Sequence, residues 1–516
     1  MHSSQTLGAL LLLSTTLRAA ELTLGTPFAD HMVLQRGKTV PVWGWANPGE
    51  KISVEFAGST QSGTAAPDGS WRVALPPMEP SAEPRILSVK SADSQERALK
   101  VQDVLVGEVW LGSGQSNMAM TVHGALNPDQ EAANSNLPLI RVFTENSKAI
   151  ASPQKTGSGA WVVCSPETAP RFSATLYFFG REIHRQLQIP VGLINSSVGG
   201  TPIESWIPRE AQLQHPSLAE SSKATTAEFQ GYDFKKAGES YQKMLAAWED
   251  RVKSAKAAGK PAPQKPKDPA DQHRRRGDLG WLFNGKINPL VPYALRGMLW
   301  YQGEANAHPG KGALYAHQLP LLVTEWRKLW NEELPFAWVQ LPNFDRGEDW
   351  CLVREAALKS LSLPKTGMAI TIDIGNPKNI HPENKQEVGR RLSLWALADV
   401  YGQKLDSSSG PVPVRHSVQG SEFHVSFSHA DQGLKSAPPS VAGFLLAGAD
   451  RVWKPAKAKI VGDSIVASSP EVPVPLALRY SWAGVPDGNL TNGVGLPASP
   501  FRTDTWPVAE LAASKP

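Results

Sequence analysis

The pattern of apolar and polar positions changes twice along the chain. From residue 21 to about residue 103, apolar residues alternate with polar ones, and turn sequences such as NPGE and PDGS recur. In KISVEF, the side chains of Ile52, Val54 and Phe56 fall on one face of a strand. The sequence therefore predicts a small N-terminal β-sandwich over residues 21–103.

Between residues 104 and 405, apolar runs that suit buried strands alternate with amphipathic helical stretches such as SATLYFFGREIHRQL and LYAHQLPLLVTEWRKLW. The strand candidates are VLVGEVWLG, LPLIRVF, PVGLINSS, LRGMLWYQG, PFAWVQLP and GMAITIDIG. This alternation predicts a parallel sheet with helices on both faces, a three-layer α/β domain. In such a domain the active site lies beyond the carboxyl ends of the strands.

Two other segments complete the predicted organisation. Residues 211–278 combine a helical part that has few large apolar residues with the irregular segment PAPQKPKDP, which predicts a surface insertion with a solvated linker. The basic run at residues 273–276 is interpreted as a solvated charge run. After residue 405 short strands return in SEFHVSFS, VAGFLLAG and LALRYSWAG, so residues 406–516 are predicted to form a second β-rich region.

The chain begins with MHSSQTLGALLLLSTTLRAA, a short apolar run that ends in small residues. Such a run is too short to span a bilayer and is typical of a secretory signal peptide over residues 1–20, cleaved near Ala19 or Ala20. No Lys or Arg precedes the run, and Arg18 lies close to the predicted cut. We expect an exported protein, periplasmic or extracellular.

Composition narrows the class of protein. A chain of 516 residues is too long for one core, and a mean hydropathy of −0.28 excludes a polytopic membrane protein. The net charge of +4 is small for this length and gives no reason to expect a nucleic-acid partner. Cys164 and Cys351 are the only cysteines, so there is no disulfide framework, although the two could pair or simply be buried. The sequence has no HExxH motif and no Cys/His cluster, and no metal or other cofactor is predicted.

The stretch GEVWLGSGQSNMAM, residues 107–120, runs a buried strand into a sharp turn at Gly112 and Gly114. It therefore presents Ser116 at a strand-to-helix corner. A Gly/Ser turn of this kind commonly does no more than cap the next helix. It is also the geometry of a nucleophile turn, in which the serine hydroxyl is exposed and nearby backbone N–H groups stabilise an oxyanion.

Two further strand ends supply oxyanion donors. In PVGLINSSVGGTPIESW, residues 190–206, a buried strand ends before Gly199 and Gly200, which let the backbone turn an N–H toward a ligand. In MLWYQGEANA, residues 298–307, a strand ends in Gln302-Gly303-Glu304. The Gln302 amide can donate to a developing oxyanion without any charge to neutralise first.

A candidate base follows the last strand of the α/β domain. In TIDIGNPKNIHPENKQEVGRRL, residues 371–392, the strand is predicted to end near Asp373, and His381 stands just before the helix that Pro382 can begin. A histidine in this place can reach a serine at the end of a neighbouring strand. Among the chain's 12 histidines, His381 is therefore the candidate base.

Taken together, these stretches resemble the SGNH hydrolase superfamily and, within it, the sialate O-acetylesterase family and related carbohydrate acetylesterases. The matching stretches are GQSNM, INSSVGGTPIESW, LFNGKINPLVPYALRGMLWYQGEAN and IHPENKQEVGRRL, with DHMVLQRGKTVPVWGWANPGE and PFRTD outside the catalytic domain. The resemblance covers nearly the whole chain after residue 20. It implies an SGNH, flavodoxin-like hydrolase domain over residues 104–405.

The resemblance implies that Ser116 is the nucleophile and that the oxyanion hole combines its backbone N–H, a glycine N–H and the Gln302 side chain. Gly200 is preferred to Gly199 because it stands five residues beyond Asn195, as the corresponding glycine does in related enzymes. The bound partner would be an O-acetylated sugar, with O-acetylated sialic acid first and acetylated xylan or another plant polysaccharide as the alternative. A catalytically inactive carbohydrate-binding protein would require the loss of a catalytic residue.

The resemblance implies that His381 is the base, but the acid departs from the superfamily pattern. Related enzymes often carry the acid three residues before the histidine, where this chain has Lys378. Asp373 is the nearest upstream acid and is the candidate that orients the His381 ring. The alternative is a backbone carbonyl that holds the ring, which would make the site a Ser–His dyad.

Overall fold

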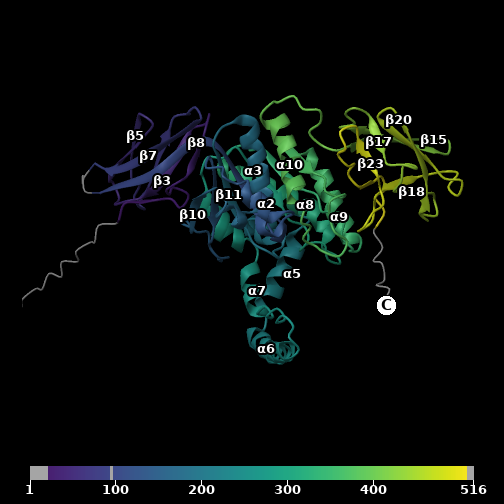
Figure 1. Cartoon of the computed structure of the whole chain (residues 1–516), viewed down its shortest axis with the longest axis horizontal. Helices are drawn as coiled ribbons and strands as arrows, with labels where there is room; N and C mark the ends of the chain where they lie inside the picture. Colours follow the sequence, from purple (N-terminus) through teal and green to yellow (C-terminus); the bar gives the residue numbers. More distant parts are fainter. Residues whose placement is uncertain (1–20, 93–96, 508–516) are drawn as a thin grey trace, which may run out of the picture.

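The computed structural model describes residues 21–92 and 97–507. An all-β region at the amino end, a central α/β region and a second β region follow one another across the molecule, and helices project below the central region (Figure 1). The predicted signal peptide, residues 1–20, lies outside the described residues. None of the helices in the two described ranges is both long and apolar enough to cross a membrane.

The N-terminal region consists of short strands, as the alternating pattern predicts. Strands β1 (Thr23–Leu24), β3 (Val40–Trp45) and β6 (Ser70–Leu75) form one sheet. The others pair with one another or with β8 and are β2 (Val33–Gln35), β4 (Lys51–Phe56), β5 (Ser59–Thr64) and β7 (Ser81–Ser91). Ile52, Val54 and Phe56 of β4 are all buried, so this strand has the single apolar face that its sequence indicates.

Strand β8 (Ala98–Gly114) joins the N-terminal region to the central sheet. Its first half pairs with β7 in antiparallel fashion, and its second half lies between β11 and β12 as a parallel strand. The predicted boundary between residues 103 and 104 falls inside this strand. Every residue from Val104 to Gly114 is buried, which explains why the sequence is mostly apolar there, with Glu108 as its only charged residue.

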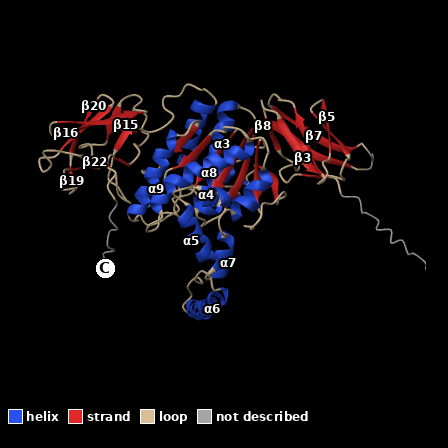
Figure 2. Cartoon of the chain, turned by 180° about the vertical axis from the view of Figure 1, so that it is seen from behind, coloured by secondary structure: helices blue, strands red, loops and turns tan. Residues whose placement is uncertain are grey.

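The central sheet has the strand order β10-β9-β11-β8-β12-β13-β14, in which only β10 is antiparallel to its neighbour. The strands besides β8 are β9 (Ile140–Glu145), β10 (Gly159–Val163), β11 (Val191–Ser197), β12 (Gly297–Tyr301), β13 (Phe336–Val339) and β14 (Thr366–Ala369). Figure 2 shows helices and strands mixed in this central region, between two regions built of strands and loops.

Helices cover both faces of the central sheet. On one face, α3 (Ala174–Leu187) and α10 (Lys385–Trp395) pack into the same apolar cluster as Trp110 and Leu299. On the other, α8 (Tyr315–Trp330) and α9 (Glu348–Lys359) join the cluster that contains Leu111 and Met298. Neighbouring residues of one strand therefore enter different cores, as the pleat of a strand requires.

The last parallel strand ends earlier than the sequence predicts. Strand β14 stops at Ala369, whereas GMAITIDIG suggested a strand as far as Asp373. The Thr371 hydroxyl donates to the carbonyl of Gln340 at 2.5 Å, and the N–H of Ile374 donates to the carbonyl of Thr371. The chain thus turns at Thr371, and the segment that carries the candidate base is a loop of greater length.

The predicted insertion is mostly helical and extends away from the body of the molecule (Figure 1). It contains the end of α4 (Arg209–Gln214), then α5 (Ala219–Gln230), α6 (Phe234–Ala257) and α7 (Pro269–Arg276). None of the 24 residues of α6 is buried, and residues 260–268, which include most of PAPQKPKDP, form no helix or strand.

Two further short helices, α1 (Ser116–Ala119) and α2 (Pro128–Ala133), lie outside the insertion and follow β8.

The C-terminal region contains several small sheets around its own apolar cluster. Its strands are β15 (Val412–Gln419), β16 (Glu422–Ser428), β17 (Leu434–Ser436), β18 (Phe444–Ala447), β19 (Lys454–Pro455), β20 (Lys457–Val461), β21 (Ser464–Ser468), β22 (Ala477–Tyr480), β23 (Leu490–Asn492) and β24 (Phe501–Arg502). The predicted runs SEFHVSFS, VAGFLLAG and LALRYSWAG contain β16, β18 and β22.

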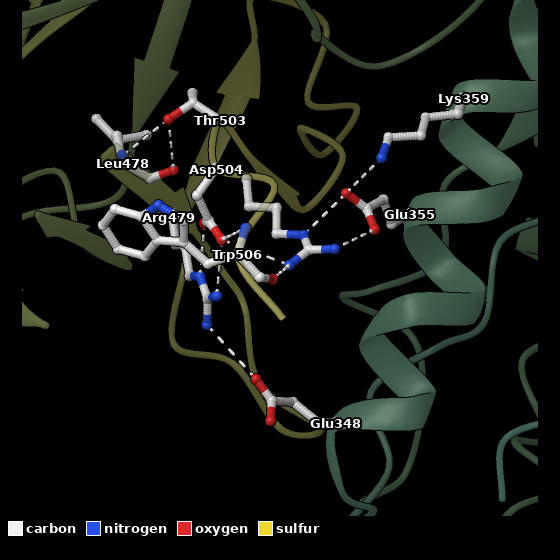
Figure 3. A network of polar contacts seen from close by, with 9 residues as sticks. Glu348, Glu355, Lys359, Leu478, Arg479, Thr503, Asp504 and Trp506 are labelled. Carbon is white, nitrogen blue, oxygen red and sulfur yellow. Dashed lines mark hydrogen bonds and ion pairs between the residues drawn. The ribbon is translucent and has the colours of Figure 1, made fainter. Parts of the chain in front are cut away.

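A cluster of ion pairs fastens the C-terminal region to α9 (Figure 3). Arg502 donates to both oxygens of Glu355, at 2.9 and 3.0 Å, and Arg479 donates to both oxygens of Asp504, at 3.0 and 3.1 Å. Glu348, at the start of α9, also lies 3.5 Å from Arg479. We call these five residues the α9 junction. Bidentate pairs of this kind are the strong form of the arginine–carboxylate interaction.

Candidate active site

The candidate nucleophile lies between the end of β8 and the start of α1. Gly114 has a φ of 138°, and a Cβ on it would lie 2.1 Å from the carbonyl oxygen of Tyr301, so a glycine is required. The N–H of Gln115 donates to that same carbonyl at 3.0 Å, and its side chain accepts from the N–H of Ala305 at 3.1 Å. The turn before Ser116 is therefore held against the end of β12.

The surroundings of Ser116 contain several free hydrogen-bond donors. Ser116 is partly exposed, and neither its hydroxyl nor its N–H bonds to another residue within the described part of the chain. A Cβ on Gly199 would lie 3.5 Å from the Ser116 Cβ, which places Gly199 beside the nucleophile. The next residue, Gly200, has a φ of 74°, and nothing lies within 4 Å of the position that a Cβ on it would take. The N–H groups of both glycines are likewise unpaired among the residues described.

The candidate base lies on the loop between β14 and α10. The backbone N–H of His381 donates to the Asn379 side chain at 2.9 Å, which fixes the loop locally. The imidazole is half-buried, and its ring nitrogens bond to none of the described residues. Burial, together with the charges of Lys385 and Lys267, lowers the pKa of His381 below its ordinary value of 6.5. The ring is therefore neutral, as a base must be, at pH 7.

One side chain ties the loop of the base to the turn of the nucleophile. Asn117 directly follows Ser116, and its Nδ2 donates to the backbone carbonyl of Ile380, directly before His381, at 2.9 Å. Asn117 is fully buried. The structure thus brings the segments that carry Ser116 and His381 together, although they are far apart in sequence.

Asp373 is not brought to the base. Both of its carboxylate oxygens accept from Arg391 of α10, at 2.6 and 2.7 Å. Arg391 itself is buried and also donates to the carbonyl of Ile370 at 2.6 Å. The hydrogen bond predicted between Asp373 and the ring of His381 is absent among the described contacts. In this arrangement the carboxylate holds α10 to the loop after β14.

Gln302 is buried at the end of β12, where the sequence predicts an oxyanion donor. Its Nε2 donates to the carbonyl of Thr201 at 3.2 Å and to the Asn306 side chain at 2.7 Å, while its Oε1 accepts from the Tyr315 hydroxyl at 2.9 Å. Both amide hydrogens are thus used within the protein. If Gln302 is to donate to an oxyanion, one of these two bonds must be exchanged for a bond to the substrate. In the structure as it stands, the bond to the carbonyl of Thr201 stabilises the turn that contains Gly199 and Gly200.

Groups that could hold a metal do not gather here. Within residues 21–92 and 97–507, no set of three or more His, Cys, Asp or Glu side chains is arranged to bind a metal ion.

Cys164 and Cys351 are both buried and form no disulfide, which answers the question from the sequence whether the two cysteines pair. Burial raises the pKa of the Cys164 thiol to about 12, so it is not a reactive thiolate.

Sequence reasoning did not assign a role to Asn117, Glu304 or Lys385, which are buried beside the candidate site. A signal for Lys385 is present in the sequence. It lies in helical register with the buried residues Val388 and Leu392 of α10, so the apolar stripe of this helix begins with a lysine. A charged residue in such a position is exceptional unless it has a buried partner.

Comparison with known proteins assigns the class of enzyme. Residues 106–257 and 285–397, more than half of the chain, match the family model described as carbohydrate esterase, sialic acid-specific acetylesterase. The chain belongs to this family and is accordingly a carboxylic ester hydrolase that acts on sugar O-acetyl groups.

Individual relatives agree with this assignment. A sialate O-acetylesterase from Rattus norvegicus is 29% identical over 455 residues, which cover 80% of each chain. The sialate O-acetylesterase of Homo sapiens is 28% identical over 432 residues, 76% of this chain and 74% of the human one. The crystal structure of a carbohydrate acetylesterase from Xanthomonas citri matches with a TM-score of 0.79 and 35% identity, and covers 94% of this chain and all of its own.

Proposed function

We propose that this protein is a serine esterase of the SGNH type that removes O-acetyl groups from sugars, with O-acetylated sialic acid as the first candidate substrate. Residues 104–405 would carry the catalytic site, with Ser116 as nucleophile and His381 as base. The observation that carries the proposal is the hydrogen bond from Asn117 to Ile380. It joins the residue after the candidate nucleophile to the residue before the candidate base.

The proposed reaction begins when the neutral His381 ring takes the proton of the Ser116 hydroxyl, which then attacks the acetyl carbonyl carbon. The oxyanion of the tetrahedral intermediate would accept from the backbone N–H groups of Ser116 and Gly200. The N–H groups of Ser116 and Gly200, both unpaired among the described residues, support these roles.

Collapse of that intermediate breaks the ester C–O bond, and His381 returns its proton to the sugar hydroxyl that leaves. Water then attacks the acetyl-enzyme with His381 again as base, and acetate is released. Gln302 would stabilise the oxyanion by exchanging its bond with Thr201 or Asn306 for one with the substrate. With Asp373 paired to Arg391, we propose that His381 acts in a dyad, and that a triad would require this ion pair to open.

Acetylated xylan or another plant polysaccharide is the alternative substrate, and the carbohydrate acetylesterase of Xanthomonas citri favours keeping a wider range of sugars in the test. Export to the periplasm or the outside stays a prediction that rests on residues 1–20.

The deciding experiment is mass spectrometry of acetate release from acetylated sialosides, xylo-oligosaccharides and pectins, with Ser116→Ala as the matched control. We expect release from the sialosides that the control abolishes. Release from xylo-oligosaccharides alone would transfer the assignment to plant polysaccharides. Acetate released equally by the control would contradict the serine mechanism.

A further inference from the structure

Lys385 is a buried charged residue that the proposed reaction does not use. Its side chain is fully buried, and it occupies the first position of α10. Burial lowers its pKa to about 7, against the opposing effect of Glu304. The amino end of a helix is also the positive end of its dipole, which disfavours a cation there. Both effects oppose a lysine at this position, so its contacts should explain its presence.

The contacts of Lys385 lead to both catalytic segments. Its Nζ donates to Asn117 Oδ1 at 2.7 Å and lies 5.1 Å from the centre of the Tyr301 ring. Asn117 connects Lys385 to two further groups, because its Nδ2 donates both to Glu304 Oε1 at 2.5 Å and to the carbonyl of Ile380. We call Asn117, Glu304 and Lys385 the Asn117 network. It joins the turn of the nucleophile, the end of β12 and the loop of the base.

Lys385 and Glu304 meet only through Asn117, and the hydrogen bonding of this network is incomplete. Glu304 is buried, and its Oε2 has no partner among the described residues, nor has the hydroxyl of the neighbouring Tyr301. Burial raises the pKa of Glu304, which Asn117 and Lys385 oppose. An unpaired buried polar atom costs stability, and apolar residues of similar size often replace buried ion pairs without loss. The arrangement is therefore better explained by function than by stability.

We propose that the Asn117 network is the positioning device of this esterase, which holds Ser116 and His381 in the geometry for proton transfer. This inference rests on the proposed function. Asn117 can reach the carbonyl of Ile380 only while its own carboxamide is oriented, and Lys385 and Glu304 fix that orientation from either side. Misplacement of reacting groups by about 1 Å can cost about 100-fold in rate.

The network also sets the charge near the base. The cations that act on His381 are Lys385 on α10 and Lys267 on the linker of the insertion, and both lower the pKa of His381 in addition to burial. Glu304 faces Lys385 from the end of β12. Removal of either lysine favours the imidazolium form, so the acid limb of the rate profile moves to higher pH.

The test compares Lys385→Met with Lys267→Met by kcat, KM and pH profile on p-nitrophenyl acetate. Lys267 is exposed and lies outside the network, so it serves as the matched control for charge alone. For Lys385→Met we expect kcat on the alkaline plateau to fall about 100-fold, with KM changed by less than about threefold and the acid limb at higher pH. For Lys267→Met we expect an unchanged plateau kcat and a smaller movement of the acid limb.

Glu304→Gln keeps the shape of the network and provides a second variant if Lys385→Met does not fold. We expect the double variant Lys385→Met/Glu304→Gln to lose much less than the product of the two single losses, because both residues act on the same side chain, that of Asn117. A plateau kcat of Lys385→Met or Glu304→Gln equal to that of the wild type would overturn the positioning role. A wild type without serine-dependent turnover would instead contradict the proposed function.

Discussion

Two groups of buried charges in this molecule differ in how completely they are paired. In the α9 junction, each carboxylate oxygen of Glu355 and Asp504 accepts a hydrogen bond from an arginine. In the Asn117 network, a single amide stands between Lys385 and Glu304, and Glu304 Oε2 has no partner among the residues described. Complete pairing of the carboxylate oxygens suits a contact that holds two regions of the chain together. The unpaired atoms lie beside the candidate nucleophile and base.

The comparison implies that damage at the catalytic site removes activity without removing stability. His381→Ala should lower kcat/KM on p-nitrophenyl acetate by about 10⁴-fold or more, because no other group in the proposed site takes the serine proton. The half-buried imidazole makes no side-chain hydrogen bond to the described residues, so the melting temperature should change little. A loss of less than about tenfold would remove His381 from the reaction.

The opposite result is expected at the α9 junction. Glu355→Gln leaves Arg502 without its bidentate partner, and breaking a buried pair typically costs about 3 kcal/mol or more. Thermal unfolding should begin several degrees lower, while kcat at 25 °C stays within about twofold of the wild type. Loss of activity with an unchanged melting curve would mean that the junction, too, serves catalysis.

Gln302 tests whether one residue can serve both catalysis and stability. Gln302→Ala should lower turnover by about 100-fold, since one oxyanion donor is typically worth 10² to 10³ in rate. Because Thr201, Asn306 and Tyr315 lose a partner, the melting temperature should fall as well. A turnover within about threefold of the wild type, measured on fully folded protein, would mean that Gln302 has a structural role only.

The smallest effect is expected at Asp373, which the structure pairs with Arg391. Asp373→Asn should lower turnover by less than about tenfold and leave the acid limb of the pH profile in place. In a triad, the carboxylate would favour the imidazolium form, so its removal would move the acid limb to lower pH. Such a movement, together with a loss near 10⁴-fold, would restore Asp373 as the orienting acid.

Apolar runs were sufficient to predict the parallel strands of the central sheet, because burial on both faces leaves a strong local signal. The antiparallel edge strand β10 was not predicted, because only Trp161 of its five residues is buried. Strand β14 ends before its predicted end because of a tertiary contact. The Thr371 hydroxyl donates to the carbonyl of Gln340 on the neighbouring segment, and no local sequence pattern encodes that bond. The partner of Asp373 is likewise chosen in three dimensions, since Arg391 is 18 residues away and reaches it from α10.

The candidate site was predictable as a set of segments but not as a set of contacts. Glycines and polar residues at strand ends pointed to Ser116, His381 and Gln302, because chemistry in α/β folds gathers at that edge. Lys385 and Glu304 could not be joined from the sequence, since their link is the side chain of Asn117 from a third segment. Only the fold brings these three residues together.

The central claim is that Ser116 is the nucleophile, and covalent trapping tests it most directly. The wild-type protein is treated with a fluorophosphonate, digested and sequenced by mass spectrometry, with His381→Ala as a variant that keeps the serine but lacks its base. We predict that the label lies on Ser116 in the peptide containing GQSNM and that His381→Ala is labelled far more slowly. A label on any other serine, or equal labelling of the two proteins, would contradict the account.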